Sequence, residues 1–131
     1  MATNEPGAPR DRILIEGLAC YGYHGVNAPE QELGQRFDVD VALALDLRPA
    51  GASDDLGQTV SYAEVAKTVR AVVEGEPHRL LEAVAEEIAH RLLGEHPTVG
   101  EVWVRVNKPS APIKGAVFSR VAVEITRSRG E

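Results

Sequence analysis

The chain has 131 residues, a formal net charge of −6 and a single cysteine, Cys20. This length suffices for one domain whose hydrophobic core needs no disulfide or metal. The acidic balance argues against a nucleic-acid groove, which needs a clustered basic face. No hydrophobic run is long enough to span a membrane and no charged-then-apolar leader is present, so the sequence predicts a cytoplasmic protein.

Composition also suggests where the domain begins and ends. Residues 1–10 contain two prolines and a glycine with little apolar content, and we expect them to form a disordered arm. The predicted domain covers residues 11–127, and residues 128–131 form a flexible C-terminus. Ile13 and Ile15 alternate with Arg12, Leu14 and Glu16, which predicts a first strand running to about Cys20. We expect the Cys20 thiol to be an inert core group.

A second strand is predicted after residue 36, because aliphatic and aromatic residues alternate strictly with Asp and Ala. Residues 21–35 lie between the two strands and are too many for a simple hairpin turn. A loop of this length with two tyrosines, a histidine and two glutamates predicts a functional site. An Ω-type loop packed on its own tyrosines is the alternative.

Two helices are predicted next, after the turn-forming residues 49–55. Ser61 and Glu64 predict a capping box, Val65, Val69, Val72 and Val73 form an apolar stripe, and Gly75 ends this helix. The second helix begins near Arg79 and ends at Gly94. Its apolar residues also recur at helical spacing: Leu81, Val84, Ala85, Ile88 and Leu92.

The last third of the chain predicts two more strands. Val102, Val104 and Val106 alternate with Trp103 and polar residues, which predicts the third strand. Val117, Val121, Val123 and Ile125 are expected on one side of the final strand. The order strand, strand, helix, helix, strand, strand predicts an α+β domain, a four-stranded antiparallel sheet with both helices on one face. The free aliphatic sheet edges favour oligomerisation, most simply as a closed ring of subunits.

Five blocks of sequence, taken together, resemble the dihydroneopterin aldolase family of folate biosynthesis. Their order and spacing match over about residues 12–127, and they are Tyr21-Gly22-Tyr23-His24-Gly25, Glu30 to Gln35, Thr59-Val60-Ser61-Tyr62, Leu80-Leu81-Glu82 and Val106-Asn107-Lys108-Pro109. The resemblance implies the T-fold, or tunnelling fold, in which four subunits close their sheets into a barrel. Two such rings usually stack, so it implies a homo-tetramer or homo-octamer with active sites at subunit interfaces.

The resemblance also implies a reaction. The family cleaves 7,8-dihydroneopterin by a retro-aldol step into 6-hydroxymethyl-7,8-dihydropterin and glycolaldehyde, and many members also epimerise the side-chain carbinol. It is described as using no metal, no cofactor and no Schiff base, because the imine of the dihydropterin ring accepts the electron pair. The partners implied are therefore a small-molecule pterin and further copies of the chain.

Three catalytic residues are implied by the match. Lys108 ends a predicted strand, and a partly desolvated amine loses its proton more readily than one in water, as a general base at neutral pH requires. Tyr62 would exchange protons with the substrate from a neighbouring subunit. Glu30 would orient the substrate side chain and hold a catalytic water, with Glu32 as the alternative loop carboxylate.

The binding residues are implied in the same way. Glu82 would accept two N–H donors from the pterin ring, although a carboxylate is favoured in any first helical turn. Leu81 and Val60 would add backbone contacts, while Tyr23 and His24, with Tyr21, would shape the loop and line the site. A lone histidine between glycines is more often a structural hydrogen-bonding group than an acid.

Three alternatives stay open at this point. Dihydroneopterin triphosphate epimerase would need convergent cations, for which Lys114 and Arg120 are the candidates, and Lys114 itself departs from the proline of many relatives. Zinc-dependent pterin enzymes are disfavoured because the four histidines are scattered without ligand spacing. A non-catalytic pterin-binding scaffold predicts that Lys108 or Tyr62 is missing, and both are present.

Overall fold

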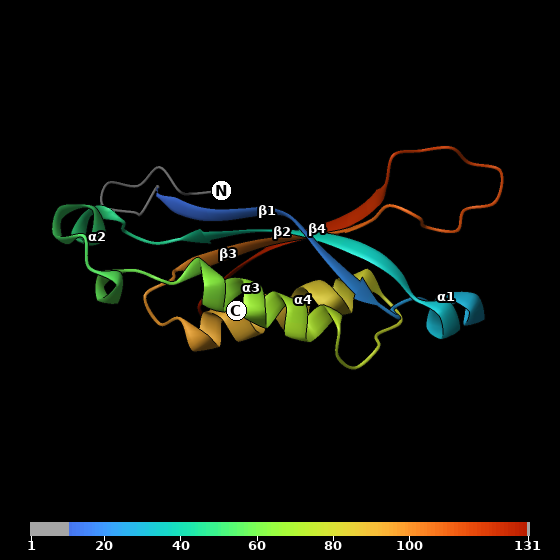
Figure 1. Ribbon diagram of the computed structural model, residues 1–131, viewed down its shortest axis with the longest axis horizontal. Helices are drawn as coiled ribbons and strands as arrows, with labels where there is room; N and C mark the ends of the chain where they lie inside the picture. Colours follow the sequence, from blue (N-terminus) through green and yellow to red (C-terminus); the bar gives the residue numbers. More distant parts are fainter. Residues whose placement is uncertain (1–10, 131) are drawn as a thin grey trace.

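A computed structural model describes residues 11–130, and the arm predicted for residues 1–10 lies outside the described residues. Four antiparallel strands form one sheet in the order β1-β2-β3-β4. Their bounds are Arg12–Gly22, Gln35–Ala44, Glu101–Lys108 and Val121–Ser128. Helices α3 (Tyr62–Val73) and α4 (Leu81–Glu95) lie together on one face of this sheet (Figure 1). The predicted two-layer α+β arrangement is confirmed.

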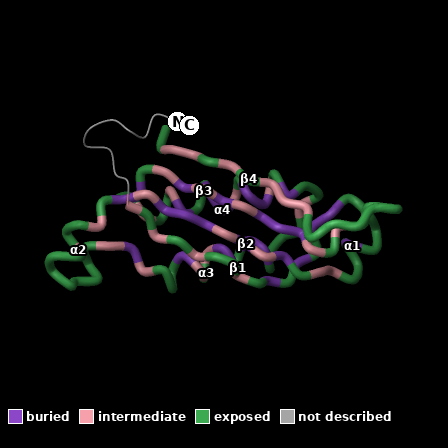
Figure 2. The backbone as a smooth tube through the Cα atoms, turned by 90° about the horizontal axis from the view of Figure 1, so that it is seen from above, coloured by how far each residue is buried: buried purple, intermediate pink, exposed green. Residues whose placement is uncertain are grey.

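The core lies between this face and the two helices, as the buried stretch through the centre of the molecule shows (Figure 2). The central strands β2 and β3 contribute alternate residues, as a sheet with one covered face requires. The helices contribute the apolar stripes predicted from their spacing. Core members from the four elements include Phe37, Val39, Val41, Leu43, Val65, Val69, Val84, Ile88, Leu92, Val102, Val104 and Val106.

A β-bulge in β1 breaks the alternation that the sequence suggested. The pairing register with β2 shifts between Ile15 and Leu18, around Gly17, whose φ is +71°. Glycine adopts this left-handed conformation without steric cost. The Asp40 carboxylate fixes the bulge by accepting from the Gly17 backbone N–H at 2.7 Å and from the Asn107 amide at 3.0 Å. The extra residue lets Leu18 and Cys20 face the core after Ile13 and Ile15 do so.

Three short elements occupy segments predicted as loops: α1 (Ala28–Leu33), α2 (Arg48–Ser53) and the 3-10 turn η1 (Leu56–Gln58). Three detailed predictions were wrong. Val117 is fully exposed, because the ladder between β3 and β4 ends at the pair Lys108 and Val121 and leaves residues 109–120 as a loop. The Ser61 hydroxyl makes no capping bond, since its backbone carbonyl takes the first N–H groups of α3. Gly94 lies inside α4, which ends one residue later.

The two ends of the elongated molecule differ. The end of α3, the start of α4, α1 and the 109–120 loop lie at one end, whereas α2, η1 and the start of α3 lie at the other (Figure 1). At the C-terminus, β4 continues to Ser128, and the Arg129 guanidinium donates to the carbonyls of His96 and Val99. Among the described residues, no helix has the length and apolar character needed to cross a membrane.

Candidate active site

A buried ion pair joins β3 to the connection between β1 and β2. Lys108 is the last residue of β3, and Glu30 lies in α1, 78 positions away in the sequence. The Lys108 Nζ donates to Glu30 Oε2 at 2.8 Å, and the two residues are only 9% and 7% exposed. The Nζ also lies 5.9 Å from the centre of the Phe37 ring. Folding therefore brings together two of the three predicted catalytic residues.

The Glu30 carboxylate is held by four hydrogen bonds. Its Oε2 accepts from Lys108 and from the Gln35 amide at 2.9 Å, and its Oε1 accepts from the backbone and side-chain N–H groups of Asn27 at 3.3 and 3.2 Å. Burial alone raises the pKa of Glu30, but the bonds from Lys108 and Gln35 outweigh burial and lower the pKa below its usual value. Glu30 is consequently an ionised carboxylate with both oxygens occupied.

The backbone conformation and close packing of Gly25 explain why the Tyr-Gly-Tyr-His-Gly block ends in a glycine. Its φ is +151°, and a Cβ at this position would lie 2.4 Å from Glu30 Oε1. The carboxylate packs directly against the Gly25 backbone, so a side chain there would displace it. Glu32, the alternative loop carboxylate, is exposed and takes no part in this contact. The structure thus places Glu30, and not Glu32, beside Lys108.

His24 connects the loop to the helical layer. It is 1% exposed, its Nε2 lies 2.7 Å from the Val73 carbonyl, and its Nδ1 accepts from the His78 backbone N–H at 2.9 Å. This pattern requires the tautomer with the proton on Nε2. Desolvation lowers the pKa of His24, which keeps the ring neutral. Both nitrogens are occupied by backbone groups, so His24 shapes the site without presenting a free polar atom to it.

The two loop tyrosines lie on the outside of this cluster. Tyr23 and Tyr21 are 42% and 49% exposed, and their rings pack edge to face with centres 5.6 Å apart. The Tyr21 hydroxyl donates to the Leu33 carbonyl and so fixes the end of α1. Part of the connection therefore packs on its own tyrosines, while the same segment also delivers Glu30 to Lys108.

The residues predicted to bind the pterin fall into two groups. Leu81 and Glu82 start α4, at the end of the molecule where residues 74–80 approach His24. Leu81 is buried and the Glu82 side chain is exposed. Val60 and Tyr62 lie at the start of α3, whose twelve residues span roughly 18 Å. Val73, at the far end of α3, contacts His24, and both His24 and Lys108 lie beside the Phe37 ring. Within one chain, Tyr62 and Lys108 are therefore about one helix length apart, since α3 runs from one end of the molecule toward the other (Figure 1).

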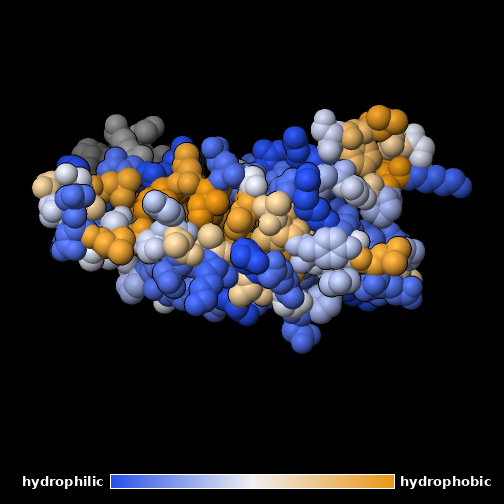
Figure 3. Space-filling view, in the orientation of Figure 1, coloured by the Kyte–Doolittle hydropathy of each residue, from blue (hydrophilic) through white to orange (hydrophobic). Residues whose placement is uncertain are grey.

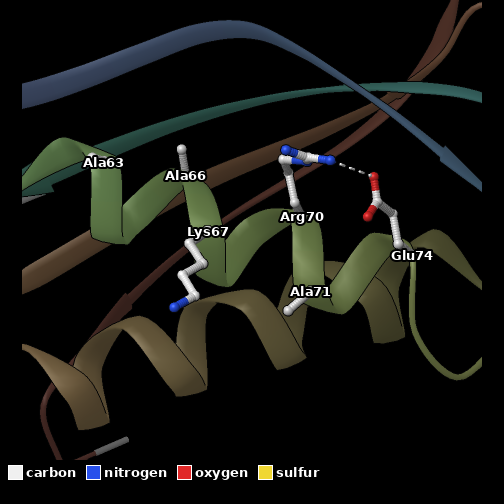
Figure 4. A pocket seen from close by; sticks show the side chains of 6 residues that line it. All are labelled: Ala63, Ala66, Lys67, Arg70, Ala71 and Glu74. Carbon is white, nitrogen blue, oxygen red and sulfur yellow. Dashed lines mark hydrogen bonds and ion pairs between the residues drawn. The ribbon is translucent and has the colours of Figure 1, made fainter.

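A shallow hollow on the outer surface lies away from the ion pair. It is lined by residues of α3 and its C-terminal end, namely Ala63, Ala66, Lys67, Arg70, Ala71 and Glu74 (Figure 4). Arg70 Nη2 lies 3.4 Å from Glu74 Oε2. None of the predicted site residues lines this hollow. The predicted site residues thus lie outside this hollow, with Lys108, Glu30 and the start of α4 at one end of the molecule and Val60 and Tyr62 at the start of α3.

Two contributors had no assigned role at the sequence level. Asn27 and Gln35 hold Glu30 in place, yet neither type of residue signals an active site by itself. Gln35 directly follows Gly34 at the start of β2, within one of the blocks that carried the family resemblance. Its position in that block was the feature of the sequence that could have indicated a role at the site.

Comparison with known proteins identifies relatives over nearly the whole chain. The family model for dihydroneopterin aldolase matches residues 13–126. The dihydroneopterin aldolases of Bacillus subtilis and Streptomyces coelicolor are 48% and 53% identical over 119 residues, which cover 91% of this chain and 98% of each relative. The crystal structure of E. coli dihydroneopterin aldolase in complex with neopterin matches with a TM-score of 0.82 at 37% identity, covering 90% of this chain and 99% of that one.

The sheet and its two helices define a T-fold domain with a buried Lys–Glu ion pair at one end of the sheet. The class is that of an enzyme, a lyase. The chain belongs to the dihydroneopterin aldolase family, and its function is the aldolase activity of that family. The family and function predicted from the sequence are confirmed.

Proposed function

We propose that the chain cleaves 7,8-dihydroneopterin into 6-hydroxymethyl-7,8-dihydropterin and glycolaldehyde, with Lys108 as the proton carrier. The observation that carries this proposal is the buried pair of Lys108 and Glu30 at 2.8 Å. Such a pair holds an exchangeable proton away from bulk water at a defined point of the fold. The start of α4, with Glu82, lies at the same end of the molecule and offers a place for the pterin ring (Figure 1).

The proposed reaction needs two proton transfers. A base takes the proton of the side-chain hydroxyl, the carbon–carbon bond breaks, and the imine of the dihydropterin ring accepts the electron pair to give an enamine. An acid then protonates that enamine. Lys108 can serve in the first transfer, directly or through a water, when its amine is in the neutral form, and it then carries the proton that the enamine needs. The ionised Glu30 holds its Nζ in position. Re-addition of glycolaldehyde to the enamine through the opposite face of its carbonyl group would also account for side-chain epimerisation.

Glu82 is proposed as the anchor of the pterin ring. The amino-pyrimidinone edge presents two adjacent N–H donors, which one carboxylate can accept as a bidentate pair. The exposed Glu82 carboxylate at the start of α4 is free to make this contact, and the backbone of Leu81 lies next to it. The neopterin complex of the E. coli relative supports a pterin ligand.

The site is proposed to be completed by a second copy of the chain. Tyr62 is 70% exposed and, with Val60, lies a helix length from Lys108 of the same chain. Strands β1 and β4 are the edges of the sheet, and exposed apolar side chains gather on the 109–120 loop (Figure 3), where Ile113, Val117 and Phe118 lie. These features favour edge-to-edge closure of four sheets into a ring, as a tetramer or as an octamer of two stacked rings.

A reaction without a metal or a Schiff base forms part of the proposal. Both nitrogens of His24 are bonded to backbone groups, and the Nε2 of His78 lies 2.7 Å from Glu87, so these neighbouring imidazoles are already engaged. Activity that is lost on exhaustive chelation and restored by zinc would contradict the metal-free proposal. Borohydride trapping of a substrate adduct on Lys108 would contradict the proposal that no Schiff base forms.

Release of glycolaldehyde from 7,8-dihydroneopterin tests the proposed role of Lys108. Lys108→Met keeps the length of the side chain but removes the proton carrier, and we expect kcat to fall by roughly 10²- to 10⁴-fold. Lys67→Met, on the exposed face of α3, is the matched control and should leave kcat unchanged. A Lys108→Met enzyme with near wild-type kcat would show that another group carries the proton.

The sequence-level alternatives are less well supported. A triphosphate epimerase would need several converging cations, whereas Lys114 and Arg120 lie on the exposed 109–120 loop. The relatives reported above are aldolases, which also disfavours a non-catalytic scaffold. The cytoplasmic location stays a prediction.

A further inference from the structure

Gln35 carries a buried polar atom that the proposed chemistry has not used. Its Nε2 donates to Glu30 Oε2 at 2.9 Å, whereas its Oε1 is shielded from solvent and has no hydrogen-bond partner among the described residues. Buried acceptors are almost always paired, because an unpaired one forfeits the bonds it would make to water. An unpaired acceptor beside an active-site carboxylate therefore indicates a donor that arrives with a ligand.

The amide cannot resolve this by turning over. Rotation by 180° would place Oε1 against the ionised Glu30 oxygen, so that two acceptors would face each other. The Glu30 carboxylate thus fixes the amide so that Nε2 is bonded and Oε1 is the atom without a partner. Glu30 is itself fixed by Asn27, so Gln35 is held from one side in a single orientation.

The amide group that carries this free oxygen also lies near Lys108. Gln35 Nε2 and Lys108 Nζ donate to the same oxygen of Glu30, at 2.9 and 2.8 Å, so they lie within two hydrogen-bond lengths of each other. A substrate hydroxyl that gives its proton to Lys108 must come to this place. Its neighbours on the same side chain are hydroxyl groups, which are the donors that an amide oxygen accepts.

We propose that Gln35 recognises the hydroxylated side chain of the substrate. Its amide oxygen accepts a hydrogen bond from a side-chain hydroxyl while its amide nitrogen holds Glu30. Glu82 is proposed to bind the pterin ring, so the two residues divide recognition between the ring and its side chain. This inference rests on the proposed function, because it assumes that the pterin side chain lies beside Lys108.

Two stable ligands separate this role from a general effect on binding. Neopterin carries the trihydroxypropyl side chain and pterin lacks it, and the dissociation constant of each is measured by calorimetry. Gln35→Met keeps the shape of the side chain but removes the acceptor. We expect it to weaken neopterin binding about tenfold and to leave pterin binding unchanged. Gln31→Met is the matched control, since Gln31 is exposed in α1 and its side chain, among the described residues, bonds the Gly25 carbonyl and not Glu30.

A second comparison separates direct contact from an effect through Glu30. If Gln35 touches the ligand, Gln35→Met still weakens neopterin binding in a Glu30→Gln background. A loss that disappears in that background would show that Gln35 acts only by positioning Glu30, and it would overturn the proposal. Equal weakening of both ligands, or of neither, would overturn it as well. If Gln35→Met does not fold, Gln35→Asn, which keeps the amide but shortens its reach, takes its place in the same comparison.

Failure of the proposed function has a different signature. A wild-type protein that binds neither neopterin nor pterin and releases no glycolaldehyde would contradict the pterin site as a whole. A wild-type protein that does all three, with Gln35→Met indistinguishable from Gln31→Met, would contradict only the role of Gln35.

Discussion

Replacing Glu30 by glutamine tests whether the ion pair with Lys108 supports the fold as well as the chemistry. The carboxylate accepts four hydrogen bonds, two on each oxygen. An amide has one acceptor atom and one donor atom, so Glu30→Gln points a donor at Lys108 and Gln35 or at Asn27 in either orientation. Removing one partner of a buried ion pair costs about 3–5 kcal/mol, and we expect a loss of about 3 kcal/mol in the free energy of unfolding at pH 7.

The pH dependence of this loss follows from the lowered pKa of Glu30. A carboxylate whose folded pKa lies below its ordinary value of 4.5 contributes stability above that value and loses it as the pH falls through the folded pKa. The difference between wild type and Glu30→Gln should therefore be constant from pH 7 to about 5 and shrink below 4.5. Urea unfolding at one fixed protomer concentration measures it, with Glu32→Gln, an exposed neighbour in α1, as the control. A Glu30→Gln protein as stable as Glu32→Gln at pH 7 would refute the reasoning.

Three further outcomes follow from the described contacts. Gly25→Ala should shift Glu30, because its Cβ would lie 2.4 Å from Oε1, and should lower both kcat and the thermal midpoint; an unchanged kcat would contradict this. The lowered pKa of His24 means that stability falls as the pH drops below about 6.5. His24→Gln should flatten the dependence of the urea midpoint between pH 7 and 5.5, and an equal slope would argue against it. Burial raises the pKa of the Cys20 thiol to about 11, so the native protein should resist iodoacetamide at pH 8 and react only when unfolded.

The pattern of the sequence was sufficient for the layers of the fold and insufficient for its details. Alternation in β2 and β3 and the helical stripes of α3 and α4 each bury one side, and a one-sided pattern determines which face meets the core. The bulge at Gly17 could not be predicted, because it depends on Asp40 across the sheet. Val117 was misplaced because an apolar residue in a loop looks the same in sequence as one in a strand.

The site required more than local patterns. Glu30 and Lys108 are 78 positions apart, and no spacing rule connects a glutamate in a loop with a lysine at a strand end. The family resemblance predicted both residues as catalytic, and the fold brings Lys108 Nζ to 2.8 Å from Glu30 Oε2. A role for Gln35 could not be predicted from the sequence, because it depends on the unpaired Oε1, whose surroundings are set by the three-dimensional structure. His24 matched a motif, but its two backbone bonds join segments far apart in the chain.

Mixing two inactive variants tests the claim that each active site draws residues from two subunits. Tyr62→Phe damages the residue at the start of α3, and Lys108→Ala damages the residue at the end of β3. If each site takes Tyr62 from one subunit and Lys108 from its neighbour, subunit exchange between the two variants creates some sites with both residues intact. Glycolaldehyde release from 7,8-dihydroneopterin should then return in the mixture while each variant alone stays inactive. Mixed oligomers, verified by native mass spectrometry, that show no recovered activity would place Tyr62 and Lys108 in the same subunit's site and contradict the claim.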